Sequence, residues 1–228
     1  MLSLRQGLGL DSVRGLGGSW TPSDDNVVAW YKNKTGITLS GSDVSAWADS
    51  SSNSYDMVQA TATKQPAYNA STGVLTFDDS DVQNLQSSGQ ISLSGAFTVG
   101  IRCNPSTFNN VLVGDNTSSN EFFKYTSSSN IRVKIDGNVG NLPLDSGTFD
   151  SGILTIVITR NGSDVVTLHK NGVAQSTTAT VAGTADIDAI GIRNPDINSY
   201  DGDISEIQIF DSTSSALTTN INTYLSAI

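Results

Sequence analysis

Short runs of apolar and β-branched residues alternate with clusters of Gly, Asn, Asp and Ser from Val27 to Phe210. This pattern is typical of antiparallel β-sandwiches, whereas βαβ units need a helical segment between successive strands. A chain of 228 residues lies within the range of one large all-β domain. We therefore expect strands at Val27–Lys32, Val44–Ala48, Val74–Phe77, Ala96–Cys103, Asn110–Gly114, Glu121–Tyr125, Asn130–Asp136, Ile153–Arg160, Asp164–Lys170, Ile187–Arg193 and Ile204–Phe210.

Two dipeptides predict hairpin turns. Asn161-Gly162 separates two expected strands and predicts a short hairpin, because both residue types tolerate the positive φ of tight hairpin turns. Asp136-Gly137 is a weaker mark of the same kind. Helical spacing of apolar residues occurs only near the end of the chain, which predicts one short terminal helix carrying Leu217, Ile221, Tyr224, Leu225 and Ile228.

The charge balance and the single cysteine exclude several function classes. Twelve basic and 22 acidic residues give a net charge of −10, so we expect no nucleic-acid partner and no attraction to an anionic membrane. No apolar run reaches the roughly 18 residues that span a bilayer. Cys103 alone forms no internal disulfide and no multi-thiolate zinc site, and its alternation with Val99 and Ile101 predicts a buried residue.

The first part of the chain differs from the rest. Residues 1–20 intersperse five glycines with five leucines, a composition that suits either a mobile terminus or an arm whose leucines dock on another protein. We expect an N-terminal arm over residues 1–24 and one domain over residues 25–228.

Several motifs resemble the laminin-G-like, concanavalin A-like lectin domains. They are Val27–Lys32 with Thr35-Gly36-Ile37 and Val44–Asp49, Gly73–Asp78, Leu168–Val173 with its Asn171-Gly172 turn, and Asp201–Phe210. The resemblance covers roughly residues 25–228 and implies a two-sheet antiparallel jelly-roll sandwich. It fixes no function, because this fold hosts lectins, glycosidases, adhesion modules and virion parts.

An acidic motif in the last expected strand is the sharpest catalytic candidate. Asp201, Asp203 and Glu206 resemble the signature of β-glucanase relatives of the family, with an aspartate where that signature begins with glutamate. A retaining glycosidase needs two carboxyls about 5–5.5 Å apart. On a regular strand Asp201 and Asp203 share one face and Glu206 lies on the other, so catalysis would require a β-bulge. We favour a structural role for Glu206.

A polar loop is the candidate glycan site. Sugars bind where an aromatic ring stacks on the apolar face of the pyranose beside planar polar groups. Residues 193–201 offer such groups, and we expect binding by Asn194, Asn198, Tyr200, Asp201 and Asp203, with Tyr200 as the stacking platform. Trp30 and Trp47 lie in expected strands and are assigned to the core, and Trp20 to anchoring the arm.

Calcium is a weaker expectation. Hard oxygen ligands in a flexible loop suit this ion, and Asp78, Asp79 and Asp81, or the loop from Asp49 to Asn53, could supply them. Acidic turn residues are more often solvated turn formers. The lone His169 has no visible catalytic partner and is expected to be structural.

A polar surface rich in Ser, Thr and Asn occurs here without a recognisable export signal. This combination favours a non-enzymatic bacteriophage virion protein, as a head decoration, fibre or tail component on the virion surface. Residues 1–20 would attach it to other virion proteins, a homo-oligomer would form, and the domain would bind cell-surface glycans with the avidity of many copies. The alternatives are an extracellular stand-alone carbohydrate-binding module and, less favoured, a glycosidase using Asp201, Asp203 and Glu206.

Overall fold

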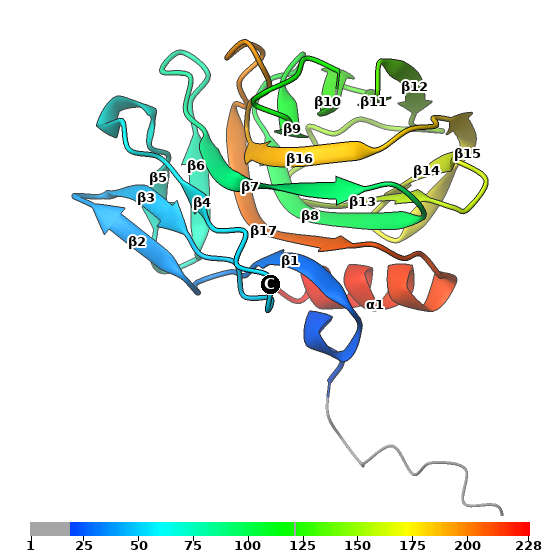
Figure 1. Cartoon of the computed structure of the whole chain (residues 1–228), viewed down its shortest axis with the longest axis horizontal. Helices are drawn as coiled ribbons and strands as arrows, with labels where there is room; N and C mark the ends of the chain where they lie inside the picture. The colour runs from blue at the N-terminus through cyan, green and yellow to red at the C-terminus, as the bar shows by residue number, and fades with distance from the viewer. Residues whose placement is uncertain (1–18, 121) are drawn as a thin grey trace, which may run out of the picture.

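The computed structural model describes residues 19–120 and 122–228 and shows two stacked antiparallel β-sheets with one helix beneath them (Figure 1). Sheet A has the order β2-β3-β4-β7-β16-β9-β10-β11-β12. Sheet B has the order β5-β6-β17-β8-β13-β14-β15. Strand β1 pairs with the second half of β17, on the same edge as β6, which pairs with the first half. One pairing between β3 and β5 joins the sheets. The expected all-β sandwich with a C-terminal helix is confirmed.

The strands of sheet A are β2 (Ile37–Ser40), β3 (Asp43–Trp47), β4 (Met57–Val58), β7 (Leu85–Leu93), β16 (Ala185–Ile190), β9 (Val111–Gly114), β10 (Phe122–Ser127), β11 (Asn130–Ile135) and β12 (Asn138–Pro143). Those of sheet B are β1 (Val27–Tyr31), β5 (Ala67–Asn69), β6 (Val74–Phe77), β17 (Gly202–Phe210), β8 (Phe97–Pro105), β13 (Leu154–Arg160), β14 (Val165–Lys170) and β15 (Val173–Thr180). Two short 3₁₀ turns cover Pro22–Asp24 and Ala62–Lys64.

The hydrophobic core lies between the two sheets. Alternate residues of each strand point into it, and its largest members are aromatic: Tyr31, Trp47, Phe77, Phe97, Phe123, Tyr125, Phe149 and Tyr200 are all essentially inaccessible to solvent. Cys103 is buried in the same cluster, as expected. Burial of this much aromatic surface explains how the domain is stabilised without a disulfide.

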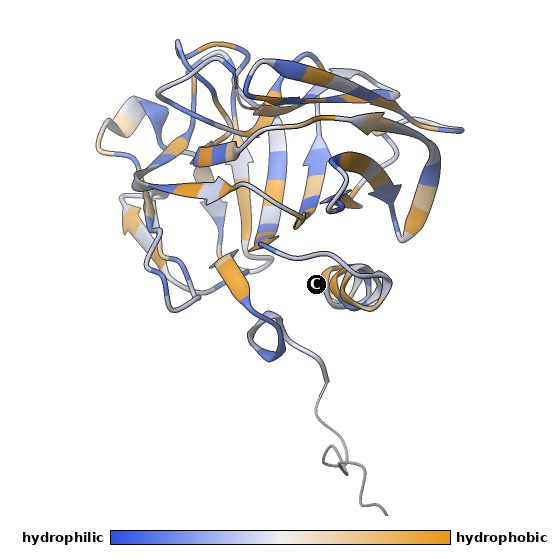
Figure 2. Cartoon of the chain, turned by 45° about the vertical axis from the view of Figure 1, so that its right-hand side comes forward, coloured by the Kyte–Doolittle hydropathy of each residue, from blue (hydrophilic) through white to orange (hydrophobic). Residues whose placement is uncertain are grey.

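Helix α1 (Ser215–Ser226) covers the outer face of sheet B (Figure 2). The Ser214 hydroxyl caps it by accepting a 3.0 Å hydrogen bond from the Leu217 amide. Leu217, Ile221 and Leu225 then pack on Val157 and Phe210 in a second apolar cluster. The helix approaches so closely that a Cβ on Gly100 of β8 would lie 2.5 Å from Ile221 Cγ2. The outer face of sheet B is therefore closed along β8 and β13.

The turns follow the sequence signals in part. Asp136-Gly137 and Asn171-Gly172 both adopt positive φ and close two-residue hairpins. The short hairpin expected at Asn161-Gly162 is confirmed, since β13 and β14 pair antiparallel, although its loop runs from Asn161 to Asp164 and the positive φ lies on Asp164. The Asn161 side chain accepts hydrogen bonds from the amides of Ser163 and Val165, which stabilises this four-residue loop.

The start of the described chain packs on the helix. The Trp20 ring lies 6.0 Å from Tyr224 and 6.4 Å from Phe210, centroid to centroid, and its Nε1 donates a 2.8 Å hydrogen bond to Asp25. Residues 1–18, most of the expected arm, lie outside the described residues, so the docking arm stays a prediction. No helix in the described ranges is long and apolar enough to cross a membrane.

Candidate functional site

Glu206 is enclosed by hydrogen-bond donors and does not face a substrate site. Its carboxylate accepts bonds from Trp30 Nε1 at 2.6 Å, Gln208 Nε2 at 2.8 Å and the Asn33 amide at 3.0 Å, and the residue is 0% exposed. Burial raises the pKa of Glu206, although these three bonds act against the rise. A general acid or nucleophile must reach its substrate, so the geometry contradicts a glycosidase built on this carboxyl.

The β-bulge that catalysis would require is nevertheless present. The register between β17 and β8 shifts between Ile204 and Glu206. The bulge directs Ile204 and Ile207 into the core and leaves Glu206 on the outer face of sheet B, against Trp30. Asp203 is held separately by a 2.7 Å bond from Thr76 Oγ1. The acidic motif therefore fastens strands together.

The loop from Arg193 to Asp201 does not form the glycan site expected from the sequence. Tyr200 is 0% exposed, packs edge-on against Phe77 and donates a 3.3 Å hydrogen bond to the Asp203 carbonyl, so the prediction that its ring is a stacking platform is wrong. The physical reason is that an aromatic residue next to a strand gains more from the core than from solvent. Tyr200, Asp201 and Asp203 lie with the start of β17 rather than with Asn194.

Asn194 and Asn198 shape the loop. Asn194 Nδ2 donates a 2.9 Å hydrogen bond to the Asn116 carbonyl, and the Asn194 amide donates to the Asp115 carbonyl. Asn198 adopts positive φ, and its carbonyl accepts a bond from the Val111 amide. These contacts attach the loop to the outer face of sheet A, beside β9.

The structure does not support the expected calcium site. Asp78 accepts bonds from the amide and hydroxyl of Ser80, which lower its pKa, and so acts as a turn former. In residues 19–120 and 122–228, no group of three or more His, Cys, Asp or Glu side chains could hold a metal ion, and this includes Asp78, Asp79 and Asp81. Asp49, in the other candidate loop, instead bonds the amides of Trp30, Ser51 and Tyr55.

The outer face of sheet A carries one continuous row of paired residues. Residues directly opposite each other across neighbouring strands point to the same side of a sheet. The register therefore places the following side chains in a single line from β3 to β12: Ala46, Val58, Gln86, Ala189, Gly114, Phe122, Lys134 and Val139. Val58 and Val139 are each 49% exposed. No helix of the described chain covers this face (Figure 1).

A ridge divides this row into two parts. The chain leaving β16 crosses directly above Gly114, where a Cβ would lie 2.7 Å from the Ile192 carbonyl oxygen and 3.1 Å from Arg193 Cβ. Only glycine permits this approach. The ridge places the Arg193 guanidinium 5.1 Å from the centroid of the Phe122 ring.

On the β4–β7 side of the ridge lies a polar groove of about 470 Å³, which we call the amide groove. Gln86 Nε2 donates to Asn84 Oδ1 at 3.0 Å, and Gln86 Oε1 accepts from Asn116 Nδ2 at 3.1 Å. These bonds fix the amide planes, while Asn116 Oδ1 accepts no hydrogen bond from the described residues. The remaining lining includes Thr61, Ser88 and the ion pair of Lys64 with Asp196.

On the other side of the ridge lies the basic cluster, which comprises Lys124, Arg132, Lys134 and Arg193 around Phe122. Lys124 pairs directly with Arg132, and Phe122 with Lys134, across β10 and β11. Burial, followed by Arg193 and Arg132, lowers the pKa of Lys124. The net charge of the chain gave no sign of such a local concentration of positive charge.

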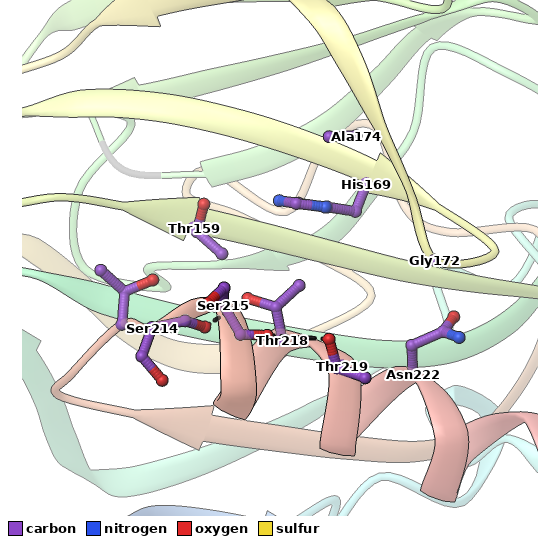
Figure 3. A pocket seen from close by; sticks show the side chains of 10 residues that line it. Thr159, His169, Gly172, Ala174, Ser214, Ser215, Thr218, Thr219 and Asn222 are labelled. Carbon is purple, nitrogen blue, oxygen red and sulfur yellow. Dashed lines mark hydrogen bonds between the residues drawn. The ribbon is translucent and has the colours of Figure 1, made fainter.

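A second hollow of about 440 Å³ lies between α1 and the strands β13 and β14 (Figure 3). Thr159 and His169 line it from the sheet, and Ser215, Thr218 and Asn222 line it from the helix. Burial lowers the pKa of His169, and the structure shows no acidic partner for it among the described residues. His169 is therefore a half-buried residue in the wall of this hollow, in agreement with its expected structural role.

Comparisons with known proteins support the fold. Neither protein-family models nor curated protein sequences show a match. Solved structures do: the binding domain of Paraclostridial Mosquitocidal Protein 1 is 15% identical over 90% of this chain, with a TM-score of 0.59. Domain 4 of AbnA, an extracellular GH43 arabinanase from Geobacillus stearothermophilus in complex with arabinotriose, is 12% identical over 86% of this chain and 98% of its own, with a TM-score of 0.58.

The botulinum neurotoxin serotype D binding domain is 14% identical over 89% of this chain, with a TM-score of 0.57. The chain spans about half the length of the two toxin binding domains. At these identities the likeness establishes a shared β-sandwich fold. The phage origin expected from the sequence finds no support among these structures and stays a prediction.

Proposed function

We propose that this protein is a non-catalytic carbohydrate-binding module whose ligand lies in the amide groove on the outer face of sheet A. One observation carries the proposal: α1 covers the outer face of sheet B along β8 and β13, whereas the outer face of sheet A holds, on the β4–β7 side of the ridge, a groove with planar amides in fixed orientations. A domain of the same fold, from an arabinanase, was solved with arabinotriose, which supports a saccharide as the ligand.

The groove offers complementary groups for sugar hydroxyls. Asn116 Oδ1 is a free acceptor, and Gln86 Nε2 has a second hydrogen to donate, since a primary amide carries two. Neighbouring hydroxyls of a sugar each donate and accept, so an acceptor and a donor held side by side match a vicinal pair. Val58, which lines the groove and is 49% exposed, provides an apolar contact for the ring.

The test is binding to an array of immobilised plant and bacterial glycans, followed by calorimetry with the glycan that binds best. Asn116→Ala removes the free acceptor and should weaken binding by about tenfold, since a hydrogen bond contributes about 1–1.5 kcal/mol. Asn222→Ala removes an amide from the hollow beside α1 and is the matched control, with unchanged affinity. The reverse pattern, or binding to no glycan, would contradict the proposal.

The virion role expected from the sequence is compatible with such a module, but it rests on the arm, the polar acidic composition, the lack of a recognisable export signal and the family resemblance. A carbohydrate-binding module does not need the arm, so we prefer it as the function of the described domain.

A further inference from the structure

The basic cluster is an unusual arrangement of like charges in an acidic chain. Of the 12 basic residues, Arg5 and Arg14 lie outside the described part, which leaves ten, and four of these ten gather beside Phe122. Like charges directly opposite each other on a sheet are destabilising, and Lys124 lies directly opposite Arg132. A bound anion would offset the repulsion between these two cations.

Lys124 is the most buried cation of the basic cluster. It is 8% exposed, and its Nζ makes no hydrogen bond or ion pair with any described residue. The charges that act on it are Arg193 and Arg132, both of the same sign. Partial desolvation of an ammonium is unfavourable when no anion offsets it, and Lys124 has only like charges beside it.

The two arginines are positioned but not neutralised. Arg132 Nε donates a 3.1 Å bond to Asn141 Oδ1, which orients the guanidinium and leaves its terminal nitrogens without a partner among the described residues. Arg193 Nη1 donates only to the neighbouring Asn194 carbonyl at 2.8 Å, and its buried Nε has no partner. The Arg193 guanidinium lies over the Phe122 ring, 5.1 Å from its centroid, and this cation–π contact helps to position it. A planar guanidinium with free N–H groups suits an oxyanion.

We propose that the saccharide bound by this module is acidic and that its carboxylate or sulfate group binds to Lys124, Arg132 and Arg193. This inference rests on the proposed function and deepens it, because the basic cluster adjoins the amide groove across the ridge formed by Arg193. A ligand that spans the ridge places its hydroxyls on the amides and its anionic group on the cations. Lys134, 5.9 Å from the Phe122 centroid, adds positive charge at the border of the cluster.

The experiment compares glycans that differ only in charge. Oligogalacturonate is titrated against its methyl-esterified form, and a heparin hexasaccharide represents sulfated ligands, within an array that also contains neutral glycans. We expect acidic glycans to dominate the bound set, with affinity falling as salt is raised. Preference for galacturonate over heparin identifies carboxylate as the group bound, and the reverse preference identifies sulfate.

Two variants locate the anion. Lys124→Met keeps the volume of the side chain but removes its charge, so binding to the acidic glycan should fall at least about tenfold, while the midpoint of thermal unfolding rises because the like-charge repulsion is gone. A residue with a merely structural role would not show this opposition between affinity and stability. Arg132→Gln, at a more exposed position, should weaken binding in the same way, and Lys34→Gln, with an equal change in net charge, should not.

The outcomes separate the two proposals. Binding restricted to neutral glycans, with no effect of Lys124→Met or Arg132→Gln, overturns this inference and leaves the amide groove intact. Loss of acidic-glycan binding in Lys34→Gln to the same extent as in Arg132→Gln would also overturn it, because net charge rather than the basic cluster would then be responsible. Absence of binding to every glycan overturns both.

Discussion

The indole Nε1 of Trp30 donates a 2.6 Å hydrogen bond to the carboxylate of Glu206, and both residues are buried. Trp30 belongs to β1 and Glu206 to β17, so this bond ties the first described strand to the last. Glu206 of the acidic motif is therefore part of the structural framework of sheet B, and a ligand is better sought on sheet A.

Glu206→Gln is expected to destabilise the protein by about 2–4 kcal/mol, because the new NH₂ group must face an N–H donor in a site that holds only donors. Asp203→Asn, at a half-buried position with a hydroxyl partner on Thr76 and a long 3.5 Å bond from Asn104 Nδ2, is the matched control and should cost less than about 1 kcal/mol. Urea unfolding measures both. Wild-type hydrolysis of a β-glucan that disappears in Glu206→Gln, without loss of stability, would contradict the structural role.

Gly100→Ala tests how tightly α1 closes sheet B. The added methyl group would overlap Ile221 Cγ2, so the helix must shift, at a cost of about 1–3 kcal/mol. A Cβ on Gly162 would meet nothing within 4 Å, so Gly162→Ala serves as the control. Equal stability of the two variants, measured by thermal unfolding, would show that the helix packs more loosely than described.

Asp188 introduces a dependence of stability on pH. Its burial, with Asp115 and Asp186 nearby, raises its pKa to about 6 from 3.8. Between these values the folded state binds more protons than the unfolded state, so the Asp188 contribution to the free energy of unfolding falls as pH rises through this window. Asp188→Asn removes that loss and keeps an acceptor for the Asn116 amide, which bonds Asp188 Oδ1 at 2.7 Å.

The Asp188→Asn variant should have the same free energy of unfolding as the wild type near pH 4 and a higher one at pH 7.5, by up to about 3 kcal/mol. Urea unfolding at both pH values provides the comparison. A stability difference between variant and wild type that stays constant from pH 4 to 7.5 would mean that the Asp188 carboxyl is not perturbed.

Much of the fold could be predicted because apolar alternation marks the buried strands. Val74–Phe77 matches its predicted bounds, and the spacing of Leu217, Ile221 and Leu225 predicted α1. Strand β7 (Leu85–Leu93) was missed because Gln-Ser-Ser-Gly-Gln occupies its centre, a composition typical of loops. It forms a strand because Leu85, Ile91 and Leu93 reach the core and its backbone is paired on both sides. Tertiary pairing here overrides local propensity.

The candidate site was harder to predict because register assembles it from distant segments. Gln86, Phe122 and Lys134 share a line only because β7, β16, β9, β10 and β11 pair in that order, which the sequence does not specify. A local signal did exist: Arg132 and Lys134 alternate with Ile131, Val133 and Ile135, which indicates cations on the solvent face of a strand. The net charge of −10 sums over the whole chain and therefore does not show this local group of cations.

The most direct test of the account is a map of backbone amide shifts by nuclear magnetic resonance during titration with the best-binding glycan. If the glycan binds in the amide groove, the perturbed amides cluster at Thr61, Gln86, Asn116 and Arg193, on the outer face of sheet A, and those of α1 are unaffected. Perturbations confined to His169, Thr218 and Asn222 beside α1, or to Asp201 and Asp203 at the start of β17, would place the ligand elsewhere and contradict binding in the amide groove.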